Sequence, residues 1–232
     1  MIIKWLGHSA FQIITNYNLK ILIDPFISNN PTSPLTAEEL NADLILVTHG
    51  HQDHFGDTME IANRTGALII ANHETSIFLS KQGLNTQGMN IGGSMDVQDI
   101  EVTMVNANHS SGLDFMDETA DGGIACGYIL KLENGRKIYH SGDTGIFGDM
   151  KMVIRDIYQP NIVLLPIGDL YTMGIEEAAI AADWISPEVL IPMHYNTFPL
   201  IEQNPLEFAE MVESLNPNIN VVIMEPGEFY EE

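Results

Sequence analysis

The 232-residue sequence predicts a single α/β domain whose β-sheets are packed between helices. Three observations lead to this prediction. Short runs rich in Ile and Val recur along the chain, helical patterns separate several of them, and no Pro-, Gly- or Ser-rich linker divides the sequence. With 45% apolar residues, a chain of this length can bury a substantial core. We therefore treat residues 1–232 as one domain.

The individual elements follow from the local patterns. Strands are expected at residues 10–15, 19–24, 44–48, 67–71, 100–106, 125–132, 136–141, 162–167, 188–193 and 219–224. Helices are expected at residues 57–65, 74–82, 149–158, 174–185 and 205–214. Asp57 and Glu60 have the spacing of a capping box, and Asp149 occupies a position suited to an N-cap. The first quarter of the chain is thus a series of strands joined by tight turns, after which helices and strands alternate.

Two long loops interrupt this series. Residues 25–36 carry three prolines, and residues 110–124 combine glycines with four carboxylates. Long loops in a compact domain are commonly functional rims. The carboxylates of the second loop are Asp114, Asp117, Glu118 and Asp121.

Charge and cysteine content exclude several classes of partner. Nine Lys and Arg residues against 32 Asp and Glu residues give a net charge of −23, which repels phosphate backbones and anionic membrane surfaces. We therefore expect a small-molecule substrate, with neither nucleic acid nor membrane as a partner. Cys126 is the only cysteine, so it cannot form an internal disulfide, and its apolar surroundings indicate a small buried side chain.

The expected location is the cytoplasm. The N-terminal residues lack the pattern of a signal peptide, and no apolar stretch approaches the ~18 residues of a membrane-spanning helix. A homo-oligomer is compatible with the sequence, which does not determine one.

The most informative segment follows the apolar run at 44–48. His49, His51, Asp53 and His54 lie within six residues, a pattern expected by chance in roughly one shuffled chain in two thousand. In extended backbone, His49 and His51 project from the same side and can bind one metal ion. Asp53 and His54 lie on the turn into the next helix and can face a neighbouring ion.

Four ligands do not fill two sites, so others must come from elsewhere in the chain. His109, Asp143 and His194 each follow an apolar run. Ligands at the same ends of successive strands can converge on one crevice. His8 and His140 lie near these loops and could support the ligands by hydrogen bonds. His73 matches no ligand position, and we interpret it as structural or exposed.

In order and spread, these seven residues resemble the signature of the metallo-β-lactamase superfamily, His-x-His-x-Asp-His followed by a distant His, an Asp and a last His. The resemblance extends over nearly the whole chain. Segments 5–9, 171–174 and 194–199 are similar to small metal-dependent hydrolases related to ascorbate-6-phosphate lactonase. The resemblance implies a four-layered αββα sandwich with a dinuclear site at one edge. It would assign His49, His51 and His109 to the first ion, Asp53, His54 and His194 to the second, and Asp143 to both.

The ligand types indicate the chemistry. Imidazole and carboxylate without thiolate suit zinc, and also manganese, iron, cobalt or nickel; zinc is the first expectation and manganese the second. Two neighbouring divalent ions can share a water and convert it into a bridging hydroxide, the nucleophile for an ester, lactone, amide or phosphoester bond. Asp53 is the catalytic candidate, because it could orient that hydroxide or shuttle its proton.

The substrate and three alternative functions remain open. None of the Lys or Arg residues falls in a ligand motif or in the 110–124 loop, which favours a neutral or cationic substrate over a sugar phosphate, although the ions could still attract an anion. A phosphodiesterase or nuclease on this scaffold would need a basic surface. A redox protein similar to the flavo-diiron members would carry Glu in place of His51 and a flavin domain. A metal-binding module without turnover would keep the same ligands.

Overall fold

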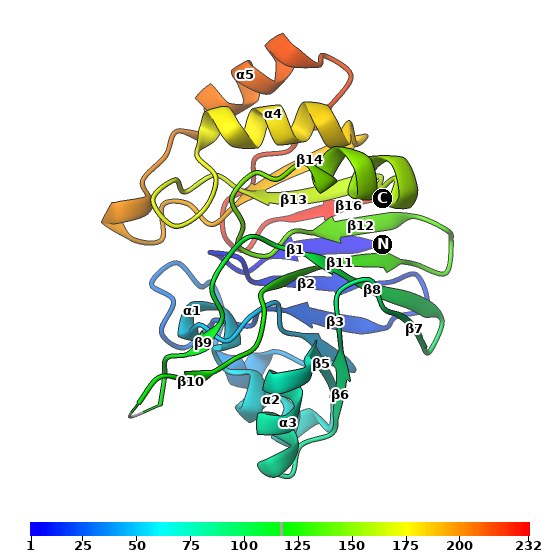
Figure 1. Ribbon diagram of the computed structural model, residues 1–232, viewed down its shortest axis with the longest axis vertical. Coiled ribbons are helices and arrows are strands. Elements are labelled where there is room, and N and C mark those ends of the chain that lie inside the picture. Colours follow the sequence, from blue (N-terminus) through cyan, green and yellow to red (C-terminus); the bar gives the residue numbers. More distant parts are fainter. Residues whose placement is uncertain (117) are drawn as a thin grey trace.

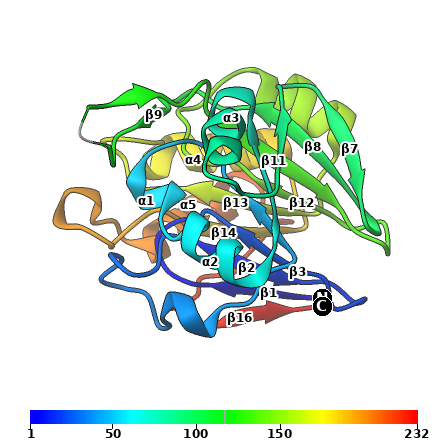
Figure 2. The same ribbon diagram turned by 90° about the horizontal axis from the view of Figure 1, so that it is seen from below.

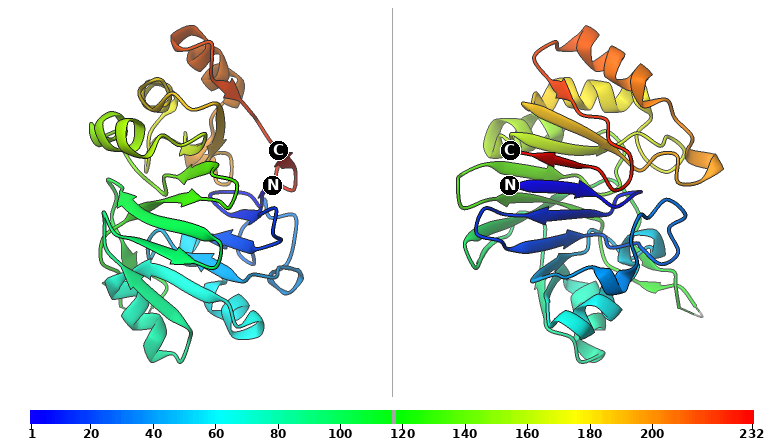
Figure 3. Two further views of the ribbon diagram at one scale, coloured as in Figure 1. Left: turned by 90° about the vertical axis from the view of Figure 1, so that its right-hand side faces the viewer. Right: turned by 180° about the vertical axis from the view of Figure 1, so that it is seen from behind.

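The apolar runs form strands that supply two cores at once. In β4 (Leu44–Leu46), Leu44 and Leu46 join the core between two sheets, whereas Ile45 joins a second core beneath helices. Side chains alternate along a strand, so a continuous apolar run is expected where both faces are covered. The protein, a computed structural model that describes residues 1–116 and 118–232, contains two such sheets packed face to face (Figure 3).

The first sheet has seven strands, antiparallel in one part and parallel in the other. In spatial order they are β16 (Phe229–Glu231), β1 (Ile2–Trp5), β2 (Phe11–Ile14), β3 (Lys20–Ile23), β4, β5 (Leu68–Asn72) and β6 (Thr86–Met89). The pairings from β16 to β3 are antiparallel and those from β3 to β6 are parallel. The ammonium group of Met1 donates to the carbonyl of Glu232 at 2.6 Å, so the two termini lie side by side (Figure 1).

The second sheet repeats this plan. In spatial order its strands are β15 (Asn220–Val221), β14 (Val189–Met193), β13 (Ile162–Pro166), β12 (Lys137–His140), β11 (Cys126–Lys131), β8 (Ile100–Asn106) and β7 (Ser94–Val97). The pairings from β7 to β12 are antiparallel and those from β12 to β15 are parallel. A short separate hairpin joins β9 (Gly112–Leu113) to β10 (Ala120–Asp121).

Helices cover the outer face of each sheet (Figures 1 and 2). The first sheet carries α1 (Gln52–Phe55), α2 (Thr58–Thr65) and α3 (His73–Lys81), with a 3₁₀ turn at η1 (Ala37–Glu39). The second carries the π-helix η2 (Met150–Tyr158), α4 (Ile175–Ile185) and α5 (Pro205–Leu215), with a 3₁₀ turn at η3 (Pro199–Ile201). The order helix–sheet–sheet–helix confirms the expected αββα sandwich.

The predicted strands and helices are all present, with boundaries that differ by a few residues. The additional strands β6, β7 and β16 lie at sheet edges, where half-exposed residues produce no apolar run. Strand β1, inside the first sheet, and the short pair β9 and β10 were not predicted either. The segment expected as a regular helix at 149–158 is π-helical, and Asp149 is its N-cap residue without a side-chain cap. Within the described ranges, no helix is long and apolar enough to cross a membrane.

The expected capping box at Asp57 is wrong. Asp57 precedes α2, but its side chain does not cap the helix. Its Oδ2 instead accepts hydrogen bonds from the backbone N–H groups of Ile27 and Ser28, both at 2.8 Å. The carboxylate therefore fastens the proline-rich loop 25–36 to the start of α2, a long-range contact that local spacing does not reveal.

Candidate metal centre

The predicted ligands come from strand ends that meet at one edge of the sandwich. His109 follows β8, Asp143 follows β12 and His194 follows β14. The pairings make these three strands run in the same direction, so their carboxyl ends share one edge. The segment after β4 approaches the same edge from the first sheet. It brings the remaining four predicted ligands, His49, His51, Asp53 and His54.

Asp143 lies at the centre of the group. Its Oδ2 is 2.9 Å from His194 Nε2, 3.2 Å from His54 Nε2 and 3.7 Å from His109 Nε2. The side chain is buried, and Gly142 before it has φ +61° with no room for a Cβ, which would lie 2.5 Å from the carbonyl oxygen of Cys126. A glycine at this point lets the chain turn sharply and directs the carboxylate into the site.

The first cluster consists of His49, His51 and His109, with one nitrogen of each ring within 4.8 Å of the others. His49 Nε2 is 3.0 Å from His51 Nδ1. His49 is buried, whereas His51 and His109 are half-buried beside the cavity described below.

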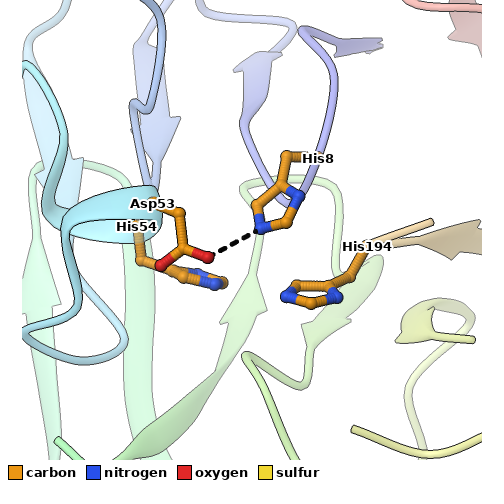
Figure 4. A group of neighbouring side chains, drawn as sticks. All are labelled: His8, Asp53, His54 and His194. Atoms are coloured by element: carbon orange, nitrogen blue, oxygen red, sulfur yellow. Dashed lines mark ion pairs between the residues drawn. The ribbon is translucent and has the colours of Figure 1, made fainter. Parts of the chain in front are cut away.

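The second cluster consists of Asp53, His54, His194 and His8, whose ligand atoms also lie within 4.8 Å of one another. Figure 4 shows these side chains pointing toward one another from three segments of the chain. Asp53 and His54 come from α1, and His194 adopts φ +55° directly after β14. His8 Nε2 is 3.3 Å from Asp53 Oδ2.

Asp24 orients both clusters and was not anticipated from the sequence. It is fully buried and accepts from the backbone N–H of Thr48 at 2.8 Å and from the Thr48 hydroxyl at 2.6 Å. Its Oδ2 also lies 2.8 Å from His54 Nδ1. The only available signal was an aspartate at the end of the apolar run 19–24, just before a proline.

This network determines which nitrogens face the site. Because the Thr48 hydroxyl donates its only proton to Asp24, it must accept from His49 Nδ1, 2.9 Å away. His54 Nδ1 likewise donates to Asp24. Both rings therefore direct Nε2 toward the centre of the site, the arrangement by which a buried carboxylate orients metal-ligating histidines.

The protonation of the cluster fits a cation at its centre. Burial lowers the pKa of His49 well below its usual range. Burial also opposes the charge of His54, but Asp143 and Asp24 outweigh this effect and raise the pKa of His54 well above its usual range. Burial would raise the pKa of Asp143, yet His194 and His54 hold it well below its ordinary value. A positive charge between Asp24 and Asp143 is therefore favoured.

Four buried atoms of the site residues lack hydrogen-bond partners among the described residues. They are His8 Nε2, His54 Nε2, Asp143 Oδ1 and His194 Nδ1. Unpaired buried polar atoms are costly, and imidazole nitrogens with carboxylate oxygens are a donor set that binds divalent transition metals. The residues present thus fit a metal site.

His8 and His140 occupy different places. Burial and the neighbouring His194 lower the pKa of His8 to about 4, and its Nδ1 lies 2.9 Å from the Thr197 hydroxyl. His140 Nε2 donates to the carbonyl of Ser9 at 3.0 Å, and its Nδ1 accepts from the backbone N–H of Gly142. His8 thus contacts Asp53 directly, whereas His140 links the backbone at Ser9 to the backbone at Gly142. His73 is exposed.

A cavity of about 350 Å³ opens onto the site. Its lining residues are His51, Asp53, His109, Ser110, Asp114, Asp143, Tyr171 and His194. No Lys or Arg of the described part of the chain lines it. The loop 110–124 therefore contributes Asp114 to the cavity, whereas Glu118 and Asp121 do not line it and Asp117 lies outside the described residues.

The chain is similar over its full length to known proteins. A family model described as "Beta-lactamase superfamily domain" matches residues 20–195. A protein of Methanobrevibacter smithii, named UPF0173 metal-dependent hydrolase, is 57% identical over 100% of this chain and 97% of its own length. A protein of the same name from Methanosphaera stadtmanae is 54% identical over the whole of both chains.

A solved structure is similar as well. It is a metallo hydrolase from the hyperthermophilic archaeon Ignicoccus hospitalis, 40% identical in sequence, with a TM-score of 0.89 over 100% of this chain and 98% of that chain. The predicted resemblance is thus confirmed both in sequence and in fold.

Proposed function

We propose a dinuclear hydrolytic site for this chain, which belongs to the β-lactamase superfamily and to the UPF0173 metal-dependent hydrolases. Metal-dependent hydrolysis is the activity of the family; the number of ions and the ligand assignment are our proposal. His49, His51 and His109 would hold the first ion, Asp53, His54 and His194 would hold the second, and Asp143 would be a ligand shared by both.

The position of Asp143 carries this proposal. One oxygen, Oδ2, lies within 3.7 Å of nitrogens from both clusters, those of His109 on one side and of His54 and His194 on the other. A single ion would leave one of the two clusters without a function, whereas a bridging carboxylate uses both.

Two divalent ions bound there would supply a water of lowered pKa and polarise the oxygen of the bond to be cleaved. Asp53 lines the cavity, and its Oδ2 lies 3.3 Å from His8 Nε2. Burial would raise the pKa of Asp53, but the His8 hydrogen bond and nearby His54 outweigh it and lower this pKa below its usual value. Asp53 therefore stays ionised at neutral pH, and beside the cavity it would orient the attacking water or relay its proton.

The substrate we propose is a small molecule with an ester, lactone, amide or phosphoester bond. The cavity volume of about 350 Å³ supports a small ligand. The absence of Lys and Arg from its described lining argues against nucleic acid, whose binding depends on basic contacts to phosphates.

Elemental analysis of protein purified without chelator or nickel resin tests the metal proposal. We expect about two transition-metal ions per chain, with zinc first and manganese second in expectation. No metal, and none taken up on reconstitution, would overturn the dinuclear site. Metal with no turnover on chromogenic esters, lactones, amides and phosphodiesters would instead favour a binding module.

Asp53→Asn tests the catalytic role. The amide cannot accept the proton, so we expect kcat to fall about 100-fold or more while the first cluster keeps its ion. Steady-state kinetics and metal content on the same preparation give both values. An unchanged kcat would remove Asp53 from proton transfer.

A further inference from the structure

Asp114 is a cavity-lining carboxylate that belongs to neither ligand cluster. It follows β9, and its Oδ1 accepts from the backbone N–H of Gln52 at 2.8 Å. Gln52 is the first residue of α1, directly between His51 and Asp53. A negative charge is therefore held beside the ligand segment by a fixed backbone contact.

The charges that line the cavity have one sign. Its carboxylates are those of Asp53, Asp114 and Asp143, and the described lining contains no Lys or Arg. In the proposed function the two divalent ions more than offset Asp53 and Asp143, whereas Asp114 is not a ligand and keeps its negative charge for the substrate group that reaches it. The net charge of −23 acts in the same direction at longer range, because it repels anions and attracts cations.

Tyr171 provides a second, independent feature of the same cavity. It lines the cavity, and 55% of the residue remains exposed. The face of an aromatic ring attracts ammonium groups, and a carboxylate lining the same cavity adds to this attraction. Both features suit a cationic group better than an anionic one.

We propose that Asp114 is a specificity-determining residue, and that the site prefers substrates with a cationic group, such as amino esters or amides, over anionic substrates such as sugar phosphates. This inference rests on the proposed function, in which the metal ligands define where the substrate bond is cleaved. The new element is the charge that the site prefers on the substrate group next to that bond.

Asp114→Asn separates charge from structure. The asparagine Oδ1 can still accept from the Gln52 N–H, so the contact to α1 is kept while the charge is removed. Asp121→Asn is the matched control, because Asp121 belongs to the same hairpin, accepts from the Gly123 N–H through its own Oδ1 and does not line the cavity.

Binding of inorganic phosphate to the zinc-loaded protein, measured by calorimetry, tests the inference whichever bond is cleaved. We expect Asp114→Asn to bind phosphate about three- to tenfold more tightly than wild type, Asp121→Asn to match wild type, and the difference to shrink at high salt. Equal affinities for wild type and Asp114→Asn would overturn the inference and leave the metal proposal standing.

Turnover of three matched esters, with a carboxylate, a neutral or a trimethylammonium group, gives the complementary result. Wild type should favour the cation, and Asp114→Asn should reduce the ratio of cation to anion kcat/KM by about three- to tenfold. A uniform loss for all three esters would make Asp114 merely structural. If the wild type and both variants all failed to load metal, the proposed function itself would be overturned.

Discussion

The two candidate ligand clusters both draw residues from segment 49–54 but differ in how firmly the protein holds them. In the first cluster, His51 and His109 are half-buried beside the cavity, and His51 Nε2 has Ser110 Oγ only at 3.3 Å. In the second cluster, His54 and His194 are buried and His54 is hydrogen-bonded to Asp24. Asp53 is half-buried beside the cavity, with His8 Nε2 3.3 Å from its Oδ2.

This contrast shows that local sequence determines which ligands are present, whereas contacts with distant residues determine how rigidly they are held. His49, His51, Asp53 and His54 are placed together by covalent spacing alone. Their rigidity depends on partners that are distant in sequence, such as Asp24 and His8. We therefore expect the second ion to bind more tightly and the first to exchange more readily.

Asp143→Asn should have the largest effect, because it weakens both clusters at once. We expect metal content to fall below about one ion per chain and turnover to fall about 10³-fold. Elemental analysis and kinetics measure these, with Asp96→Asn on the exposed surface as the control for a lost carboxylate. Full metal occupancy in a folded Asp143→Asn protein would show that Asp143 is not a ligand shared by the two ions.

Asp24→Asn should weaken the second cluster more than the first, because Asp24 contacts His54 directly and reaches His49 only through Thr48. The asparagine oxygen can keep the bond from the Thr48 N–H, but the charge that orients His54 is lost, so affinity for the second ion should fall about 10- to 100-fold. Chelator competition measures both affinities. An equal loss of affinity for the two ions would contradict the expectation that Asp24 supports the second cluster more than the first.

Chelation of the wild-type protein should remove the ions in two phases, the faster one from the more exposed first cluster. His51→Ala should abolish the fast phase and retain the slow one, because it removes a ligand of that cluster alone. Stopped-flow measurement with a chromogenic chelator checks both statements. If His51→Ala lost the slow phase instead, the first cluster would be the one that releases its ion more slowly.

His8→Asn should have the smallest effect. The change removes the ring that holds Asp53, so kcat should fall about tenfold with KM and metal content nearly unchanged. Thr197→Val is the matched control, since it removes the partner of His8 Nδ1 and leaves the ring in place. Loss of an ion in His8→Asn would instead identify His8 as a ligand.

Several features were predictable because they depend on local pattern. Buried central strands such as β8 and β13 are continuous apolar runs, so their positions were evident. Edge strands such as β6 and β16 have only four and three residues and are partly exposed, so they were missed. The positions of His109, Asp143 and His194 after apolar runs sufficed to include them among the ligands.

Other features depended on contacts between distant residues. Asp24 and His54 are 30 residues apart, and His8 and Thr197 are 189 apart, so no local spacing relates either pair. Asp57 has the spacing of a helix cap but satisfies the backbone of another loop. Composition and spacing could therefore establish which side chains can bind metal. The orientation of each ring, the support of Asp53 and the charge of the cavity were decided by packing, because they depend on which buried groups meet when the two sheets close on each other.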